Sequence, residues 1–332
     1  MSIRILKAGV SDAFFDEGRY EHQHMGINPT GAMDTVAVKI VNALTLNPAN
    51  EAVLEMHFPA ATILFEKDAL IAISGADFTA SINDQFIPVN KPIFVKQHAL
   101  LQFKKPQKGA RVYLGVHGGF KLSSWSESYS TNTLVNAGGF NGQRLRTGAE
   151  IAFKIHIAYP SLQLSNNFKI LPFQANINEL YQSSILSIVP GRHFRLLINN
   201  SKQQLLRQNF TITADSNRMG YKLQSHPLLL QQPQNIISSG VTKGTIQLLP
   251  NGQLIILMAD HQTTGGYPII GHVITADVCS LAQYNPTDSI HFKLVSSSEA
   301  EDDFLNQHRH LLQLQNACNL QMNEFINTNC RP

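Results

Sequence analysis

The chain has 332 residues, of which 43% are hydrophobic and 15% charged, a balance that predicts a folded protein with a real core rather than a disordered tail. Its net charge of +3 is small and its Lys and Arg residues are scattered, which argues against a nucleic-acid partner. The 3 cysteines lack metal-type spacing, residues 1–10 contain no signal-type apolar run, and the most apolar stretch, 254–259, has only a strand's length. We therefore expect a cytoplasmic protein that spans no membrane and holds no metal of its own.

Most of the chain consists of short apolar runs separated by Gly, Pro, Asn and Asp, which predicts a mainly β protein with few helices. In chain order, the predicted strands are 61–65, 70–73, 93–95, 100–103, 111–116, 151–157, 185–189, 210–213, 245–249 and 253–258. Asp34 is expected to cap a helix that runs to about residue 46. Asp277 is expected to cap a short helix through residue 283.

The polar stretch 161–180 is the best candidate linker in the chain. From residue 299 onwards, acidic residues precede apolar ones at helical spacing, which predicts an amphipathic C-terminal helix that serves packing or subunit contact. The predicted organisation is an N-terminal β domain (1–165), a C-terminal β domain (166–296) and a C-terminal helical tail (297–332).

Several cofactor and catalytic motifs have no match in the chain. The sequence lacks the G-x-x-x-x-G-K-[ST] phosphate loop, the dinucleotide-binding fingerprint and the G-x-S-x-G elbow of serine hydrolases. It also lacks the Ala-Met-Lys-Met biotin attachment site, so this chain is not expected to carry covalently attached biotin.

The strongest candidate site is the run 260–268, which reads Asp-His-Gln-Thr-Thr-Gly-Gly-Tyr-Pro and follows an apolar strand. Its side chains suit amide or phosphate oxygens, and its two glycines allow a close approach to the backbone, but a turn between two strands explains the run equally well. The stretch 28–34 leads into a helix N-terminus that favours anions, although a simple cap at Asp34 is the better explanation. Arg218 lies in a turn, where it either clamps an anion or pairs with a neighbouring acid.

Together these stretches resemble the allophanate hydrolase subunit 2 family over about residues 5–295. That family includes the C-subunit of bacterial 5-oxoprolinase, the carboxyltransferase region of urea carboxylase and an antagonist of a histidine-kinase inhibitor. The marks of the resemblance include Gly31-Ala32-Met33-Asp34, Arg218-Met219-Gly220, Ser238-Ser239-Gly240-Val241, Gly244-Thr245-Ile246-Gln247 and the whole run 260–268.

The resemblance implies two cyclophilin-like β-barrel domains and a role as one subunit of an ATP-dependent amide hydrolase complex. It favours 5-oxoprolinase, in which 5-oxoproline, ATP and water give glutamate, ATP with Mg is shared with subunit-A-like and subunit-B-like partners, and this chain alone is inactive. One alternative is a biotin-dependent carboxyltransferase acting on urea or a similar amide. Another is a non-catalytic antagonist of a subunit-B-like kinase inhibitor.

The resemblance also suggests which residues bind substrate or phosphate, but it identifies no catalytic residue or general base. These binding candidates are Arg19, Asp34, Arg218, Asp260, Gln262, Thr263, Thr264, Gly265, Gly266 and Tyr267. The chain departs from the family pattern at other places, each of which removes a charge or donor that acts on an anionic substrate. These departures are Tyr129, Gln143, Ala149, Asn217, Gly191-Arg192-His193 and His261. They imply a changed substrate, a divergent branch or an inactive subunit.

Overall fold

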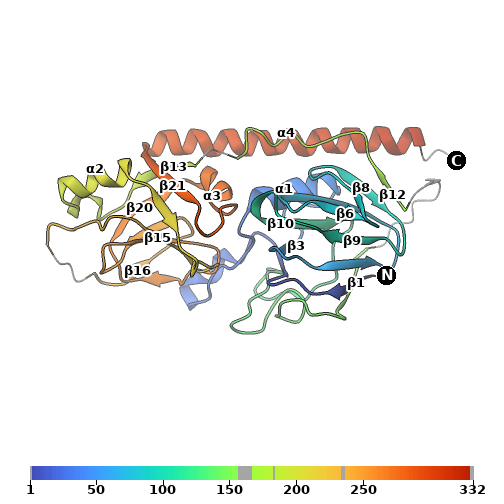
Figure 1. Ribbon diagram of the computed structural model, residues 1–332, viewed down its shortest axis with the longest axis horizontal. Coiled ribbons are helices and arrows are strands. Elements are labelled where there is room, and N and C mark those ends of the chain that lie inside the picture. Colours follow the sequence, from blue (N-terminus) through green and yellow to red (C-terminus); the bar gives the residue numbers. More distant parts are fainter. Residues whose placement is uncertain (1, 156–166, 182–183, 233–235, 330–332) are drawn as a thin grey trace. The chain divides into compact units, whose positions relative to one another are not determined.

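The computed structural model describes residues 2–155, 167–181, 184–232 and 236–329 (Figure 1). It divides into two compact units. Unit 1 comprises Met1–Gly18, Asp34–Ile177 and Arg309–Pro332, and unit 2 comprises Arg19–Met33 and Asn178–His308. Both units are mainly β, which confirms the predicted fold class. The predicted boundary near residue 165 lies outside the described residues, so the predicted domain limits stay predictions.

Unit 1 contains two six-stranded antiparallel sheets. The first has the order β11-β1-β4-β9-β6-β7 and consists of β1 (Ser2–Lys7), β4 (Thr62–Phe65), β6 (Ala80–Ile82), β7 (Gln85–Phe86), β9 (Leu100–Phe103) and β11 (Glu150–Ala152). The second has the order β12-β8-β5-β10-β3-β2 and consists of β2 (Ala13–Phe15), β3 (Val53–Met56), β5 (Ala69–Asp77), β8 (Pro92–Val95), β10 (Lys108–Val116) and β12 (Phe168–Ile170). Apolar side chains of both sheets, such as Ile63 and Val112, share one core, so the two sheets face each other across it.

Helix α1 (Thr35–Leu44) of unit 1 begins where the sequence predicts. The Asp34 carboxylate accepts a hydrogen bond from Ala37 N at 2.9 Å, which confirms Asp34 as the cap. The buried face of the helix, including Ile40, packs against β5 and β10.

Unit 2 is built on a closed barrel of seven strands in the order β13-β20-β17-β18-β15-β14-β21. These strands are β13 (Ile185–Pro190), β14 (Phe210–Ile212), β15 (Gly220–Gln224), β17 (Thr245–Leu248), β18 (Leu254–Leu257), β20 (Ile269–Val273) and β21 (Ser289–Leu294). Only β13 and β21 pair in parallel. A separate two-stranded sheet joins β16 (Ser239–Gly240) to β19 (Thr264–Gly265).

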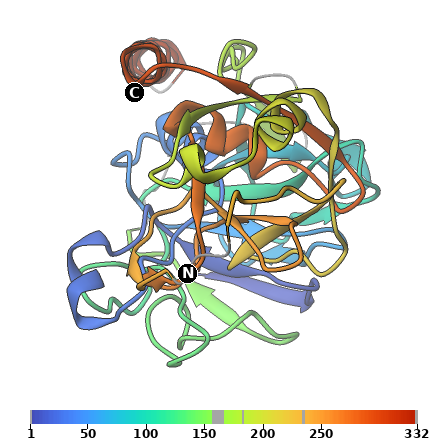
Figure 2. The same ribbon diagram turned by 90° about the vertical axis from the view of Figure 1, so that its left-hand side faces the viewer.

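Helices α2 (Asn199–Arg207) and α3 (Thr275–Leu281) lie outside the barrel, α2 against β21 and α3 against β13 (Figure 2). Two short 3-10 helices, η1 (Tyr20–Met25) and η2 (Phe194–Leu196), also belong to unit 2. The prediction that Asp277 caps a helix is wrong, because α3 begins two residues earlier at Thr275. The carboxylate of Asp277 instead accepts a hydrogen bond from Ser187 N of β13 at 2.7 Å.

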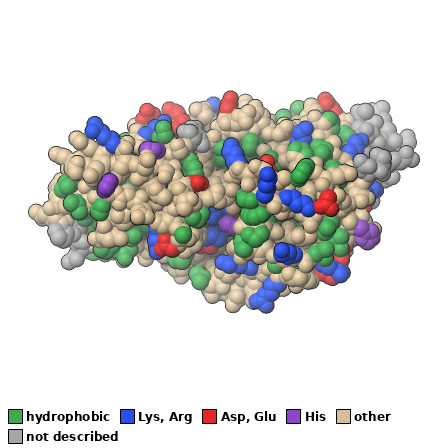
Figure 3. All heavy atoms as spheres, in the orientation of Figure 1, with side chains coloured by type: hydrophobic (Ala, Val, Ile, Leu, Met, Phe, Trp, Pro, Cys, Tyr) green, Lys and Arg blue, Asp and Glu red, His purple; other side chains and the backbone are tan. Residues whose placement is uncertain are grey.

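Helix α4 (Ser297–Asn329) is the predicted C-terminal helix, and it extends over 33 residues. In unit 1 it buries Cys318 and Met322, and Met322 packs with Leu70, Phe94 and Leu171. None of the described helices, α4 included, combines the length and apolar character needed to cross a membrane. On the face shown in Figure 3, basic and acidic side chains are interspersed.

Candidate functional site

The predicted binding residues are distributed over both units. Arg19, Arg218 and the run 260–268 belong to unit 2, whereas Asp34 belongs to unit 1. The largest group of candidates therefore lies in unit 2.

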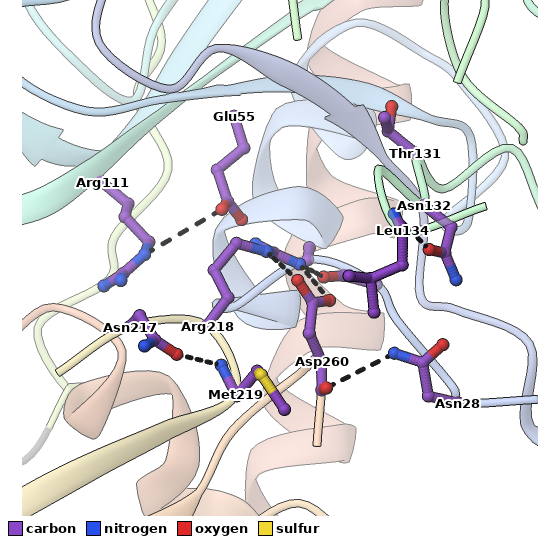
Figure 4. A network of polar contacts seen from close by, with 12 residues as sticks. Asn28, Glu55, Arg111, Thr131, Asn132, Leu134, Asn217, Arg218, Met219 and Asp260 are labelled. Atoms are coloured by element: carbon purple, nitrogen blue, oxygen red, sulfur yellow. Dashed lines mark hydrogen bonds and ion pairs between the residues drawn. The ribbon is translucent and has the colours of Figure 1, made fainter. Parts of the chain in front are cut away.

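The central feature in unit 2 is a bidentate ion pair between Arg218 and Asp260 (Figure 4). Arg218 Nε lies 2.8 Å from Asp260 Oδ2, and Nη2 lies 3.1 Å from Oδ1. The pair is placed by the antiparallel ladder of β15 and β18, because Arg218 precedes β15, Asp260 follows β18, and Asp260 N donates to Arg218 O at 2.8 Å. Of the two roles open to Arg218 from the sequence, the structure shows pairing with an acid.

The same pair holds the early segment 19–33 against the second half of the chain. Arg218 Nη2 donates to Gly31 O, and Asn28 Nδ2 donates to Asp260 O at 3.4 Å (Figure 4). Lys243 Nζ adds hydrogen bonds to the carbonyl oxygens of residues 32 and 33 at 3.1 and 2.8 Å. These contacts tie one segment to side chains that lie far away in the sequence. We call Arg218, Asp260, Lys243 and Asn28 the clamp.

The segment held by the clamp includes Arg19 and Thr30. Arg19 is buried, and its backbone N–H donates to Pro29 O at 2.8 Å, which closes the segment into a loop. Thr30 has a φ of +46°, a left-handed conformation that a β-branched residue rarely adopts. Its hydroxyl is buried and has no hydrogen-bond partner in the described part of the chain. Strain of this kind persists only where the surroundings fix it, and the clamp supplies that constraint.

The run 260–268 is not a simple turn, because part of it forms β19. Ser239 pairs with Gly265 and Gly240 with Thr264, and Val241 N donates to Thr263 O at 3.2 Å. Thr264, Gly266 and Tyr267 are exposed, and Gln262 and Thr263 are half-buried. Asp260 and Pro268 are also half-buried, so within the run only His261 and Gly265 are closed to a ligand in this arrangement.

His261 lies inside this run and is fully buried. Its Nδ1 lies 2.6 Å from Gln262 O, and because a carbonyl oxygen only accepts, Nδ1 carries the proton. Burial, followed by the charge of Lys243, lowers the pKa of His261. The ring is therefore neutral at pH 7.

In unit 1, Asp34 belongs to a buried chain of polar groups that was not predicted from the sequence. Asp34 N donates to the Tyr113 hydroxyl at 2.9 Å, and this hydroxyl donates to Glu55 Oε2 at 2.8 Å. Arg111 Nε lies 3.9 Å from Glu55 Oε1 (Figure 4). Burial, followed by the charge of Glu55, raises the pKa of Tyr113 well above its ordinary value, so the phenol stays protonated. The sequence signal that could have indicated this buried chain is a Glu and a Tyr within strands that are otherwise mainly apolar.

A second polar group in unit 1 fixes the loop that contains Tyr129. Asp16 accepts hydrogen bonds from the hydroxyls of Ser128 and Ser130 at 2.6 and 2.5 Å and from Tyr129 N at 2.6 Å. The Tyr129 ring has Lys154 Nζ 5.7 Å from its centroid. A positive charge is thus present beside Tyr129, one of the positions at which the chain departs from the family pattern.

Two further observations concern possible metal ligands and a cavity in unit 2. Within the described ranges, no three His, Cys, Asp or Glu side chains are grouped as metal ligands. A cavity of about 690 Å³ in unit 2 borders the end of the run, where it is lined by Gly266, Tyr267, Pro268 and mainly apolar residues from 228–230 and 248–252. Its lining contains no charged side chain.

Comparison with known proteins adds independent information. Residues 25–294 match the family model described as carboxyltransferase domain, subdomain A and B. The chain is 32% identical to the 5-oxoprolinase C-subunit of Escherichia coli over 312 residues, which cover 94% of this chain and 97% of the relative. It is 33% identical to the 5-oxoprolinase C-subunit of Haemophilus influenzae over 291 residues, covering 86% and 88% of the two chains.

Solved structures of two larger fungal proteins share the fold. Urea amidolyase of K. lactis and urea carboxylase of Kluyveromyces lactis each superpose with a TM-score of 0.85 at 24% identity over 94% of this chain. The chain spans only 20% of the first protein and 29% of the second.

Proposed function

This chain belongs to the carboxyltransferase domain family, subdomains A and B, and we propose that it is a subunit of an amide-hydrolysing complex. The observation that carries the proposal is the 32% and 33% identity to two 5-oxoprolinase C-subunits over most of both chains. By the same relationship, the proposed substrate is 5-oxoproline, the product is glutamate, and the reaction consumes ATP. Because these relatives are named as the C-subunit of 5-oxoprolinase, we further propose that this chain assembles with subunit-A-like and subunit-B-like chains.

The proposed part played by this chain is to bind and orient the amide. Thr264 and Tyr267 present exposed hydroxyls, and Gln262 presents a half-buried amide, beside a neutral His261. These uncharged groups suit the carbonyl and N–H of a lactam. Arg218 and Lys243 act indirectly, because their charged groups hold the segment 19–33.

The residues of this chain do not fit a complete ATP–Mg site. There is no glycine-rich phosphate loop in the sequence, and the described residues hold no cluster of three metal ligands. We therefore propose that the partner subunits contribute most of the nucleotide and metal contacts, and that this chain shows little turnover alone.

The proposal is tested by measuring glutamate formation from 5-oxoproline with the reconstituted complex. Replacing Thr264 by Val removes an exposed hydroxyl of the run and should lower kcat/KM about 10-fold, the effect of roughly 1.4 kcal/mol. Thr211→Val is the matched control, because Thr211 lies in β14 and its hydroxyl is 3.3 Å from Ser289 Oγ. Equal kcat/KM values for the two variants would show that the run 260–268 does not contribute to substrate binding.

A second candidate, a biotin-dependent carboxyltransferase acting on urea or a similar amide, is favoured by the shared fold with urea carboxylase. It requires a separate biotin carrier, because the sequence has no Ala-Met-Lys-Met attachment site. Transfer of the carboxyl group from a carboxybiotin carrier to a nitrogen of urea, which leaves biotin free on the carrier, and no glutamate from 5-oxoproline, would select it. A stable complex with a subunit-B-like protein and no turnover of either amide would select the non-catalytic antagonist.

A further inference from the structure

Gln247 is a polar residue in β17, a strand of the unit 2 barrel whose four residues are all buried. It lies on β17 between Ile246 and Leu248, which belong to the barrel core, so the alternation of the strand directs Gln247 to the outer face. Only 1% of Gln247 is nevertheless exposed, and its Nε2 has no hydrogen-bond partner among the described residues. An unpaired buried donor costs about 1–3 kcal/mol, so its presence calls for an explanation.

The amide group of Gln247 reaches the run 260–268. A Cβ added at Gly265 would lie 2.4 Å from Gln247 Nε2, so a side chain at this position would displace the amide. Ser239 is paired with Gly265, and paired residues of an antiparallel ladder project from the same face. Ser239 Oγ is also buried and has no partner in the described part of unit 2. Two uncharged donors without acceptors therefore lie on the same face of the β16–β19 ladder.

Gln253 shows how the same barrel satisfies a structural glutamine. Its Nε2 donates to Ser225 O at 3.1 Å, and its Oε1 accepts from Ser225 N at 2.9 Å. Both ends of the Gln253 amide are thus used within the protein, whereas the donor end of Gln247 has no partner in the described ranges.

We propose that Gln247 and Ser239 bind a carbonyl oxygen of the substrate. Gln247 Nε2 donates one hydrogen bond to that oxygen, and the hydroxyl of Ser239 donates a second. Because both donors are uncharged and buried, they favour a neutral amide carbonyl over a carboxylate, whose burial would require a positive charge. Lys243, a cation in the turn before β17, donates to two backbone carbonyl oxygens of residues 32 and 33. This assignment rests on the proposed function, since an amide substrate provides the carbonyl.

The ladder that lies against Gln247 is short enough to open. β16 and β19 contain two residues each and form a sheet separate from the seven-stranded barrel. A two-stranded ladder of this length has little stability of its own. The substrate reaches Gln247 by displacing β19, and the barrel strands keep their pairing.

The test replaces Gln247 by Met, which has a similar shape but no donor, in the full chain assembled with its partner subunits. Initial rates are measured with 5-oxoproline and with its thiolactam analogue, whose sulfur is a weak acceptor. The wild-type complex should prefer the lactam, and Q247M should lose about 10- to 100-fold in kcat/KM for the lactam and most of that preference. Urea unfolding of Q247M should show no loss of stability, because the change removes an unpaired buried donor.

Gln253→Met is the matched control with the opposite expected pattern. It breaks two hydrogen bonds to Ser225, so it should lower stability and leave the lactam preference unchanged. The assignment is overturned if Q247M keeps the wild-type preference, or if Q247M is destabilised as much as Q253M.

A complex that turns over neither compound would refute the proposed function. Carbonyl binding by Gln247 is then tested without turnover. The side-chain amide NMR signal of Gln247, identified by its loss in Q247M, is followed while acetamide is added to the full chain. A saturable shift of this signal supports carbonyl binding, and an unchanged signal overturns it.

Discussion

The clamp residue Arg218 gives the most quantitative prediction. Arg218→Met keeps an apolar stem but removes hydrogen bonds that include two to Asp260 and one to Gly31 O. The side chains of Arg218 and Asp260 are only 14% and 25% exposed, so the variant leaves a largely buried carboxylate without its cation. Breaking a fully buried pair costs about 3–5 kcal/mol, and the residual exposure lowers our expectation to about 3 kcal/mol. For a domain of this size, that loss lowers Tm by roughly 6–12 °C.

Hydrogen exchange measured by mass spectrometry locates this effect. The segment 19–33 should lose protection in Arg218→Met, because the variant frees the backbone that the clamp holds, while peptides from the α1 region should not change. The double variant Arg218→Met with Asp260→Leu should recover part of the loss, since no unpaired charge remains. A loss below about 0.5 kcal/mol, the size typical of a surface pair, or unchanged exchange in 19–33 would refute this account.

Three further predictions concern single residues in both units. Burial raises the pKa of Asp12 from 3.8 to about 7, so the folded protein retains a proton that the unfolded chain releases above about pH 4. Stability should therefore fall by up to about 4 kcal/mol between about pH 4 and pH 7, and urea unfolding of Asp12→Asn should not show this fall. Tyr113→Phe leaves the buried Glu55 without its hydroxyl donor and should cost about 2–4 kcal/mol in the same assay, with a cost below about 1 kcal/mol arguing against the buried chain. Gly265→Ala displaces Gln247 and should raise KM for 5-oxoproline about 10-fold; a normal KM would show that the position of this amide does not matter.

Local patterns predicted part of the regular structure: the ten predicted strand ranges each overlap a strand, whereas other strands, among them β1, β15, β20 and β21, were not predicted. The run of apolar residues in 100–103 became β9 with the same limits, and Asp34 caps α1 through Ala37 N. Acidic residues ahead of apolar ones at helical spacing predicted α4. In each case the signal lies within neighbouring residues, where hydrogen bonding and amphipathicity are decided.

Features that depend on distant contacts were not predictable in the same way. Helix α2 was missed because its sequence is polar and buries only Ser201 and Leu205. The assignment of residues 19–33 to unit 2 depends on hydrogen bonds to Arg218 and Lys243, which lie 187 positions from Gly31 and 211 positions from Ala32. No local pattern in a single sequence specifies such pairings.

The candidate site shows the same division between local and distant information. The run 260–268 was identifiable from its mixed donors and its glycines, with a turn as an equal alternative. Pairing with β16 and the approach of Gln247 to Gly265 emerge only from the fold. A Gln between two core positions of β17 is ordinary in a strand with one buried face, so the sequence alone carried no signal that Gln247 is buried.

The most direct test of the central claim is an omission experiment with purified subunits. Glutamate formation from 5-oxoproline is measured with ATP for the subunit-A-like and subunit-B-like partners, with and without this chain. The account predicts ATP-dependent glutamate only when all three proteins are present, and little from this chain alone. Glutamate at the same rate without this chain would contradict its role as a subunit of the hydrolase.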